Sequence, residues 1–308
     1  MRRSVLLALS AATMASACSP YLYKSEIANF QFGVTDLTTA YQSGLKNVST
    51  ERAALQKLQW TPPRATVSLT DGCALPALIV ASTDDSVPCA LQPKEKGMRI
   101  SQAPRQAVSA MPILDALRDY ASALATITNA EDQAALESAA SQLQGSVSSL
   151  ATASKVELPK ELGALGSLVT TAGAATLNQR RFQMLKNGVT AANDSVAVLG
   201  KAMGEAFNQM RKARADTVLL TATTMANQLG PAQSDVDYAA SLAALQAKVD
   251  TIETLRRVDP AVAANDMVIA HAELAKALND DSRQIGAVVS ALKTFKDKAE
   301  AVHDAFAS

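Results

Sequence analysis

The stretch MVIAHAELAKALNDDSRQIGAVVSALKTFKDKAEAVHDAF, residues 267–306, has the most regular apolar pattern of the chain. Its apolar residues recur at steps of three and four, which places them on one side of an α-helix that buries against other helices. His271 and Asp281 occupy two positions of the same series. We predict one helix that begins at Asp259-Pro260, a capping residue before proline, and ends near the last residue. The apolar members of the series are Met267, Leu274, Leu278, Ile285, Val288, Leu292, Phe295, Ala299, Val302 and Phe306.

The same period predicts helices over residues 23–60, 109–152 and 160–229, and a shorter helix from Ser234 to about Arg257. Prolines or a Gly-Pro pair separate these segments. The first series contains Ile27, Phe30, Val34, Leu37, Tyr41, Val48, Leu55 and Leu58, with Gly44 and Glu51 interrupting it. The second contains Leu114, Leu117, Leu124, Ile127, Leu143, Val147 and Leu150, and the third contains Val189, Val196, Met203 and Met210. Gly188, Gly200 and Gly204 lie within the third segment, where they allow either close helix approach or a bend.

The composition agrees with a helical fold. Aromatic residues make up 4% of the 308 residues, and alanine is abundant. Alanine-rich chains with few aromatic residues favour close-packed helices over sheets. We therefore predict an all-α fold, an elongated antiparallel bundle of four or five long coiled-coil-like helices. Residues 26–308 are expected to form a single helical-bundle domain.

Residues 61–104 differ from the rest, because they hold six of the 11 prolines. Residues 66–69 alternate like a strand, so we predict a loop insertion between two helices, with a small hairpin. The loop contains Cys73 and Cys89, which we expect to form a disulfide in an oxidising compartment. A metal site or a redox pair is the alternative, but no histidine lies near and the Cys-x-x-Cys spacing is absent.

The N-terminus has the three zones of a secretory signal. Arg2 and Arg3 are followed by an apolar run over residues 4–14 and by the small residues of 15–17. The apolar run is too short to remain as a membrane-spanning helix. Cys18 follows the small residues directly.

The sequence Ala15-Ser16-Ala17-Cys18 resembles the lipobox of bacterial lipoproteins. In that class the chain is cut before the cysteine, which carries acyl chains such as palmitate. The resemblance implies a signal peptide over residues 1–17, lipid attachment at Cys18 and a tether over residues 18–25. Ser19, in place of aspartate, implies the outer membrane, with the protein facing the periplasm. The alternative is a soluble secreted protein cut after Ala17.

The charge excludes one class of partner. Without residues 1–17 the chain has 27 basic and 29 acidic residues, a net charge of about −2. Nucleic-acid binding needs a basic surface, so we expect no nucleic-acid partner. No later segment is apolar for long enough to cross a membrane. Contact with the membrane is therefore expected through the lipid.

Catalytic motifs are absent from the sequence. Glu300 and His303 have the Glu-x-x-His spacing of di-iron bundles, but Val268 stands where a second such pair needs glutamate before His271. We expect no enzyme activity, no catalytic residue, no cofactor and no metal site. Arg180-Arg181 and the basic residues of 211–214 are interpreted as solvated helix faces. His271 and Asp281 either set the packing register or line a ligand cleft.

Three functions remain open. The first is a lipid-anchored structural or protein-interaction module with an envelope protein as its partner. The second is a periplasmic ligand-binding or sensory bundle that holds a small molecule near His271 and Asp281. The third is a membrane-active long-helix protein, in which the loop of residues 61–104 would insert. An apolar stripe left outside a filled core favours the first, and an enclosed polar cleft favours the second.

Overall fold

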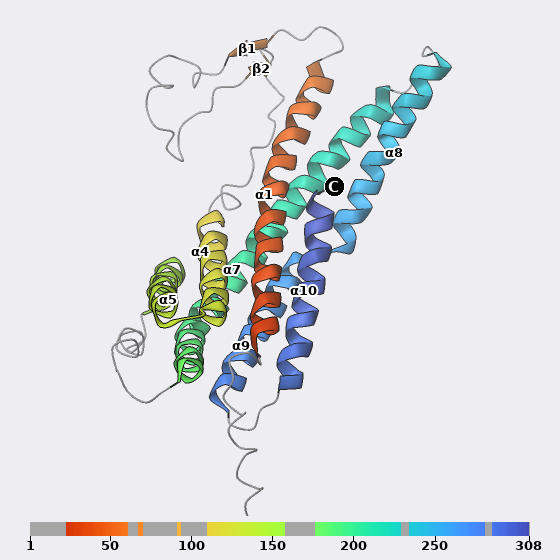
Figure 1. The fold of residues 1–308 in the computed structure, drawn as a ribbon. Helices are drawn as coiled ribbons and strands as arrows, with labels where there is room; N and C mark the ends of the chain where they lie inside the picture. The colour runs from red at the N-terminus through yellow and green to blue at the C-terminus, as the bar shows by residue number, and fades with distance from the viewer. Residues whose placement is uncertain are drawn as a thin grey trace, which may run out of the picture. The chain divides into compact units, whose positions relative to one another are not determined.

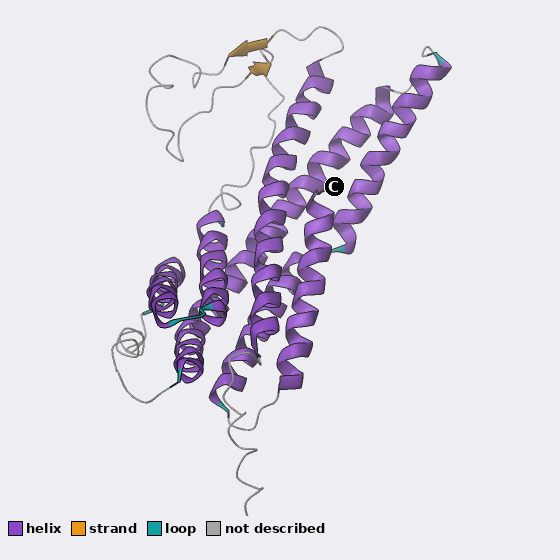
Figure 2. Ribbon diagram, viewed as in Figure 1, coloured by secondary structure: helices purple, strands orange, loops and turns teal. Residues whose placement is uncertain are grey.

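The structure is a computed structural model that describes residues 23–60, 67–69, 91–93, 110–157, 176–228, 234–280 and 285–307. These residues form seven helices and two short strands (Figures 1 and 2). The helices are α1 (Lys24–Trp60), α4 (Met111–Asn129), α5 (Gln133–Ser154), α7 (Leu177–Gln228), α8 (Asp235–Arg257), α9 (Pro260–Asn279) and α10 (Ile285–Ala307). The predicted helical class is confirmed for the described residues, although they form more helices than the four or five expected.

The chain divides into two compact units. The first comprises Met1–Thr38, Met111–Gly204 and Pro260–Glu300. The second comprises Thr39–Ala110, Glu205–Asp259 and Ala301–Ser308. Helices α1, α7 and α10 contribute residues to both units, and the single domain predicted over residues 26–308 stays a prediction.

The single helix predicted over residues 109–152 is wrong, because the chain breaks between α4 and α5. Asp132 caps α5 by accepting a hydrogen bond from the Ala135 amide at 2.8 Å. Such short polar side chains compete with helical hydrogen bonds and favour helix starts. At the other end of α5, Lys155 adopts the left-handed conformation of a C-cap, with φ of 57°.

The single helix predicted from residue 260 to the end is also wrong, because α9 ends at Asn279 and α10 begins at Ile285. The two helices run antiparallel within the first unit. The Phe30 ring lies 5.7 Å from His271 of α9 and 5.9 Å from Phe295 of α10, and Lys298 pairs with Asp266 at 2.9 Å. The apolar series stays in phase across the connection, so its periodicity hides the reversal.

The antiparallel arrangement holds for some neighbours in the first unit and fails for others. Helices α7 and α9 run antiparallel, since Thr190 contacts Asn279 and Asn193 contacts His271. Helices α5 and α7 run parallel. Three contacts with increasing numbers on both helices show this: Gln133 with Arg180, Leu143 with Gly188, and Ser154 with Ser195. The prediction of an antiparallel bundle is therefore correct only in part.

The predicted buried positions are confirmed wherever the structure describes them, with two exceptions: Leu58 and Ile285 are half-buried. The other residues of the predicted apolar series in α1, α4, α5, α7, α9 and α10 are buried. Gly44 and Glu51, which interrupt the first series, are buried with their apolar neighbours. Asp281 lies outside the described residues.

The predicted strand in the loop is present as β1 (Val67–Leu69), and it pairs antiparallel with β2 (Leu91–Pro93). The register joins Val67 to Pro93 and Leu69 to Leu91. The sequence did not predict β2, because three residues that include a proline carry too little pattern. Cys18, Cys73 and Cys89 lie outside the described residues.

Close helix approach at the glycines of α7 is confirmed and gives a first testable prediction. A Cβ at Gly200 would overlap Val268 and lie 3.4 Å from the Ala264 carbonyl oxygen, whereas a Cβ at Gly145 of α5 would meet nothing within 4 Å. We expect Gly200→Ala to lower the free energy of unfolding by about 1–3 kcal/mol. The matched change Gly145→Ala should raise it by about 0.5–1 kcal/mol. Urea denaturation of both variants checks this, and a neutral Gly200→Ala would contradict the close packing.

Candidate functional site

His271 lies at the centre of the first unit, where four helices meet. Its side chain comes from α9 and is 1% exposed. Its Nε2 atom lies 2.8 Å from the Tyr120 hydroxyl of α4, and its Nδ1 atom lies 3.3 Å from Asn193 Oδ1 of α7. An amide oxygen can only accept, so Nδ1 carries the proton and Nε2 accepts from the tyrosine. Phe30 of α1 closes the site with a ring contact at 5.7 Å.

Burial determines the charge of this cluster. Removal from water lowers the pKa of His271 to about 3 and raises the pKa of Tyr120. The imidazole is therefore neutral at neutral pH. Both ring nitrogens are hydrogen-bonded within the protein, which leaves neither of them for a ligand in this conformation. The arrangement instead fixes how α4, α7 and α9 meet.

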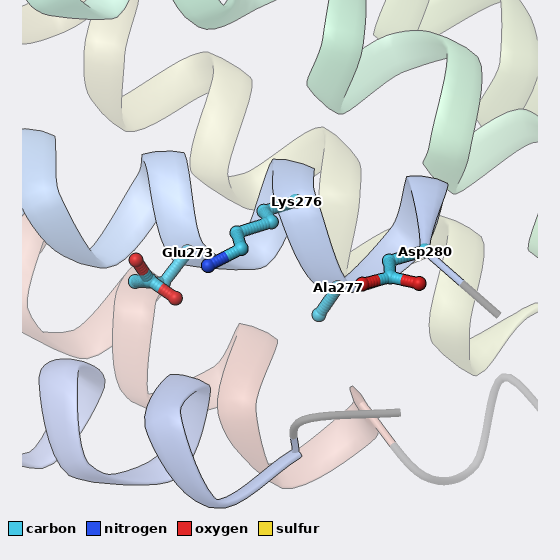
Figure 3. Close-up of a pocket in the computed structure, with 4 residues that line it drawn as sticks. All are labelled: Glu273, Lys276, Ala277 and Asp280. Carbon is cyan, nitrogen blue, oxygen red and sulfur yellow. The ribbon is translucent and has the colours of Figure 1, made fainter. Parts of the chain in front are cut away.

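A shallow hollow lies elsewhere on α9, lined by Glu273, Lys276, Ala277 and Asp280 (Figure 3). Its empty volume is about 190 Å³ and includes open solvent. The Lys276 side chain extends toward Glu273 along the helix surface. Three of the lining residues belong to α9 and Asp280 follows its last residue, so the hollow lacks the converging walls of an enclosed ligand cleft.

A buried ion pair lies in the second unit. Arg214 of α7 is 1% exposed, and its Nε atom lies 3.3 Å from Glu51 Oε1 of α1. The same guanidinium donates to the carbonyl oxygens of Ala305 and Phe306, at 3.3 Å and 3.2 Å. These carbonyls belong to the last turn of α10, where no following helical turn supplies amide donors to the carbonyl oxygens. Arg214 therefore joins three helices of the unit.

Burial raises the pKa of Glu51, while the charges of Arg214 and Lys248 act in the opposite direction. The interpretation of the basic clusters as solvated faces is wrong for two of their members. Arg214 is buried in this ion pair, and Arg181 is 4% exposed and donates to the Ala130 carbonyl. The sequence pattern does not reveal this pairing, because Glu51 and Arg214 are 163 residues apart in the chain.

Helix α8 presents an exposed apolar face in the second unit. Among its described side chains only Ile252 and Leu255 are buried. Tyr238, Leu242 and Val249 are 45%, 48% and 41% exposed, and Leu245 is half-buried; we call these four residues the α8 seam. With Ile252 they recur at steps of four and three, the spacing of a helix-packing seam.

Contacts inside the second unit show how α8 is held. Arg211 of α7 donates to the Val258 carbonyl, just beyond α8, at 2.6 Å. Lys248 is close enough to Glu51 for its charge to lower the pKa of that carboxyl. Lys248, Ile252 and Leu255 thus mark the inner side of α8. A helix turns by about 100° per residue, which places the α8 seam next to this inner side on the helix surface. The α8 seam faces outward.

The described residues contain no group of three His, Cys, Asp or Glu residues that could hold a metal ion. Nor is any helix within them long and apolar enough to cross a membrane. His303 is half-buried on α10.

No family model, curated protein or solved structure matches the chain. Its function must therefore be inferred from its own geometry. The His271 and Arg214 clusters are both internal and bonded within their units, whereas the α8 seam is external. The seam is the candidate site. The spacing of Tyr238, Leu242, Leu245 and Val249 is visible in the sequence, but burial alone shows that it faces outward.

Proposed function

We propose that the chain is a lipid-anchored lipoprotein of a bacterial envelope that acts without catalysis, as a structural or protein-interaction module. The observation that carries the proposal is the exposed α8 seam of the second unit. A contiguous apolar stripe on an otherwise packed helical unit is typical of a protein-binding surface. The satisfied hydrogen bonds of His271 favour this function over the ligand-binding alternative.

The anchor in this proposal is the acylated Cys18, which would hold the protein on the periplasmic face of the outer membrane. One acyl chain binds a membrane marginally, and several bind it firmly, at about 0.8 kcal/mol for each buried CH₂. The helices would then present the α8 seam in the periplasm, where another envelope protein can reach it.

A disulfide between Cys73 and Cys89 completes the proposal. The pairing of Leu69 with Leu91 supports it, because Cys73 follows the first of these residues by four positions and Cys89 precedes the second by two. A bridge closing this loop would contribute about 3 kcal/mol in the chain-entropy model.

The anchor is tested by intact mass and membrane fractionation of the native protein beside a Cys18→Ser variant. We expect a mature chain that starts at Cys18, carries acyl groups and fractionates with the outer membrane. Cys18→Ser should lose the acyl mass and the membrane fraction. The matched variant Cys73→Ser should keep both. A wild-type chain without acyl mass in the soluble fraction would overturn the anchor.

The interaction role is tested by photo-crosslinking in cells, with benzoylphenylalanine in place of Tyr238. The control carries the same group in place of Val236, which is on the same helix and is 78% exposed. At 100° per residue Val236 points away from the α8 seam. We expect a crosslinked adduct from position 238 and none from position 236. No adduct from position 238, or equal yields from both, would overturn the interaction role.

A further inference from the structure

The two ends of α8 carry opposite charges. Asp235 and Asp237 lie in its first turn, and Arg256 and Arg257 lie in its last turn. A helix with this distribution attracts a second copy of itself only when the two run antiparallel, because each acidic end then meets a basic end. In a parallel pair, like charges would meet at both ends.

The apolar residues favour the same arrangement. In an antiparallel pair that places Leu242 opposite Leu245 of the other copy, Tyr238 falls opposite Val249. Both pairs form twice by symmetry, as in an isologous interface. The stretch from Tyr238 to Val249 covers about 17 Å of helix at 1.5 Å per residue. Each apolar side chain of one α8 seam therefore has an apolar partner on the α8 seam of the other copy.

The charged flank agrees with this register. At 100° per residue, Arg256 points in the same direction as Tyr238, and Asp235 lies about 60° from it, on the side away from the unit's interior. The register that pairs the apolar residues places Asp235 of one copy opposite Ile252 of the other, about one helical turn from Arg256. Arg256 already contacts Glu253 of its own helix at 2.9 Å, in an exposed pair that can be shared.

We propose that the partner of the α8 seam is the α8 seam of a second copy of this chain, docked antiparallel. This inference rests on the proposed function, since a seam of this size forms a weak interface in dilute solution. Anchoring confines both copies to one membrane surface and raises their effective concentration. The result is a symmetric pair of anchored chains.

The crosslinking experiment separates this inference from the proposed function. An adduct from position 238 with twice the mass of the mature chain, identified by peptide mass spectrometry as this chain linked to itself, is the expected result. An adduct containing a different protein would overturn the second copy and leave the interaction role standing. An adduct with lipid, or no adduct, would overturn both.

The antiparallel orientation is tested by charge reversal in the same full-length, anchored chain. We expect Arg256→Asp to reduce the self-crosslink by about ten-fold, because two attractive contacts become repulsive. The double variant Asp235→Arg/Arg256→Asp should restore it. Lys212→Asp makes the same charge change at an exposed position of α7 and should leave the yield unchanged. Circular dichroism of each purified variant confirms that α8 is retained. A double variant as weak as Arg256→Asp would overturn the antiparallel pairing.

Discussion

Replacing Arg214 with methionine is expected to lower the free energy of unfolding by about 3–5 kcal/mol. The guanidinium is 1% exposed and is the hydrogen-bonded partner of Glu51. Its loss leaves a buried carboxylate without its ion pair and removes the hydrogen bonds of Arg214 to the last carbonyls of α10. Methionine keeps much of the volume, so the effect reports charge and hydrogen bonding. Urea denaturation of the variant beside the wild type measures this loss of free energy of unfolding.

Two further variants separate the pair from the packing around it. Lys212→Met removes an exposed charge from the same helix and should change the free energy of unfolding by less than about 0.5 kcal/mol. Glu51→Leu combined with Arg214→Met should cost less than Arg214→Met alone, since it removes the uncompensated carboxylate. A strictly additive double variant, or an Arg214→Met protein as stable as the wild type, would contradict a buried ion pair.

Period and burial were predictable from the sequence because they follow from local spacing. The seam of α1 from Ile27 to Leu55 and the heptads of α7 are buried as their steps of three and four require. Gly200 was predicted to allow either close helix approach or a bend, and the structure shows close approach. It interrupts a helix without ending it, and Val268 lies against it.

Chain reversal and long-range pairing were not predictable in this way. Ile285 continues the series of Met267 and Leu274 without a phase change, although it begins a separate helix. Arg214 looks like any solvated arginine until the structure places Glu51 beside it. The unpredicted break between α4 and α5 has a local signal in the capping residue Asp132, but the apolar pattern on both sides obscured it.

The His271 cluster also shows a feature that the sequence predicts only in part. Sequence placed a polar residue in the seam of α9 but left open whether it met a ligand or other side chains. The structure supplies Tyr120 and Asn193 from two other helices. Neither neighbour carries a charge at neutral pH, so nothing in the cluster compensates a protonated imidazole. Stability must therefore depend on pH through this residue.

The direction of that dependence follows from the two pKa values. The folded pKa of His271 is about 3, below the usual value of 6.5 that it regains on unfolding. Its contribution to stability is complete above about pH 6.5 and is lost as the pH falls toward 3, because the unfolded chain binds the proton first. Between about pH 7 and about pH 4, we expect it to remove about 3 kcal/mol from the free energy of unfolding.

His271→Gln isolates this effect, since both proteins share every carboxylate. At pH 7 the variant should be about 2 kcal/mol less stable, because glutamine replaces the ring contacts and hydrogen bonds imperfectly. It has no proton to gain, so the two profiles should cross near about pH 5. Tyr120→Phe removes one hydrogen bond but keeps the imidazole, and its profile should run parallel to the wild type, lower by about 1 kcal/mol. Urea denaturation across this pH range measures all three. A His271→Gln profile parallel to the wild type would mean that the imidazole already reaches water in the folded protein.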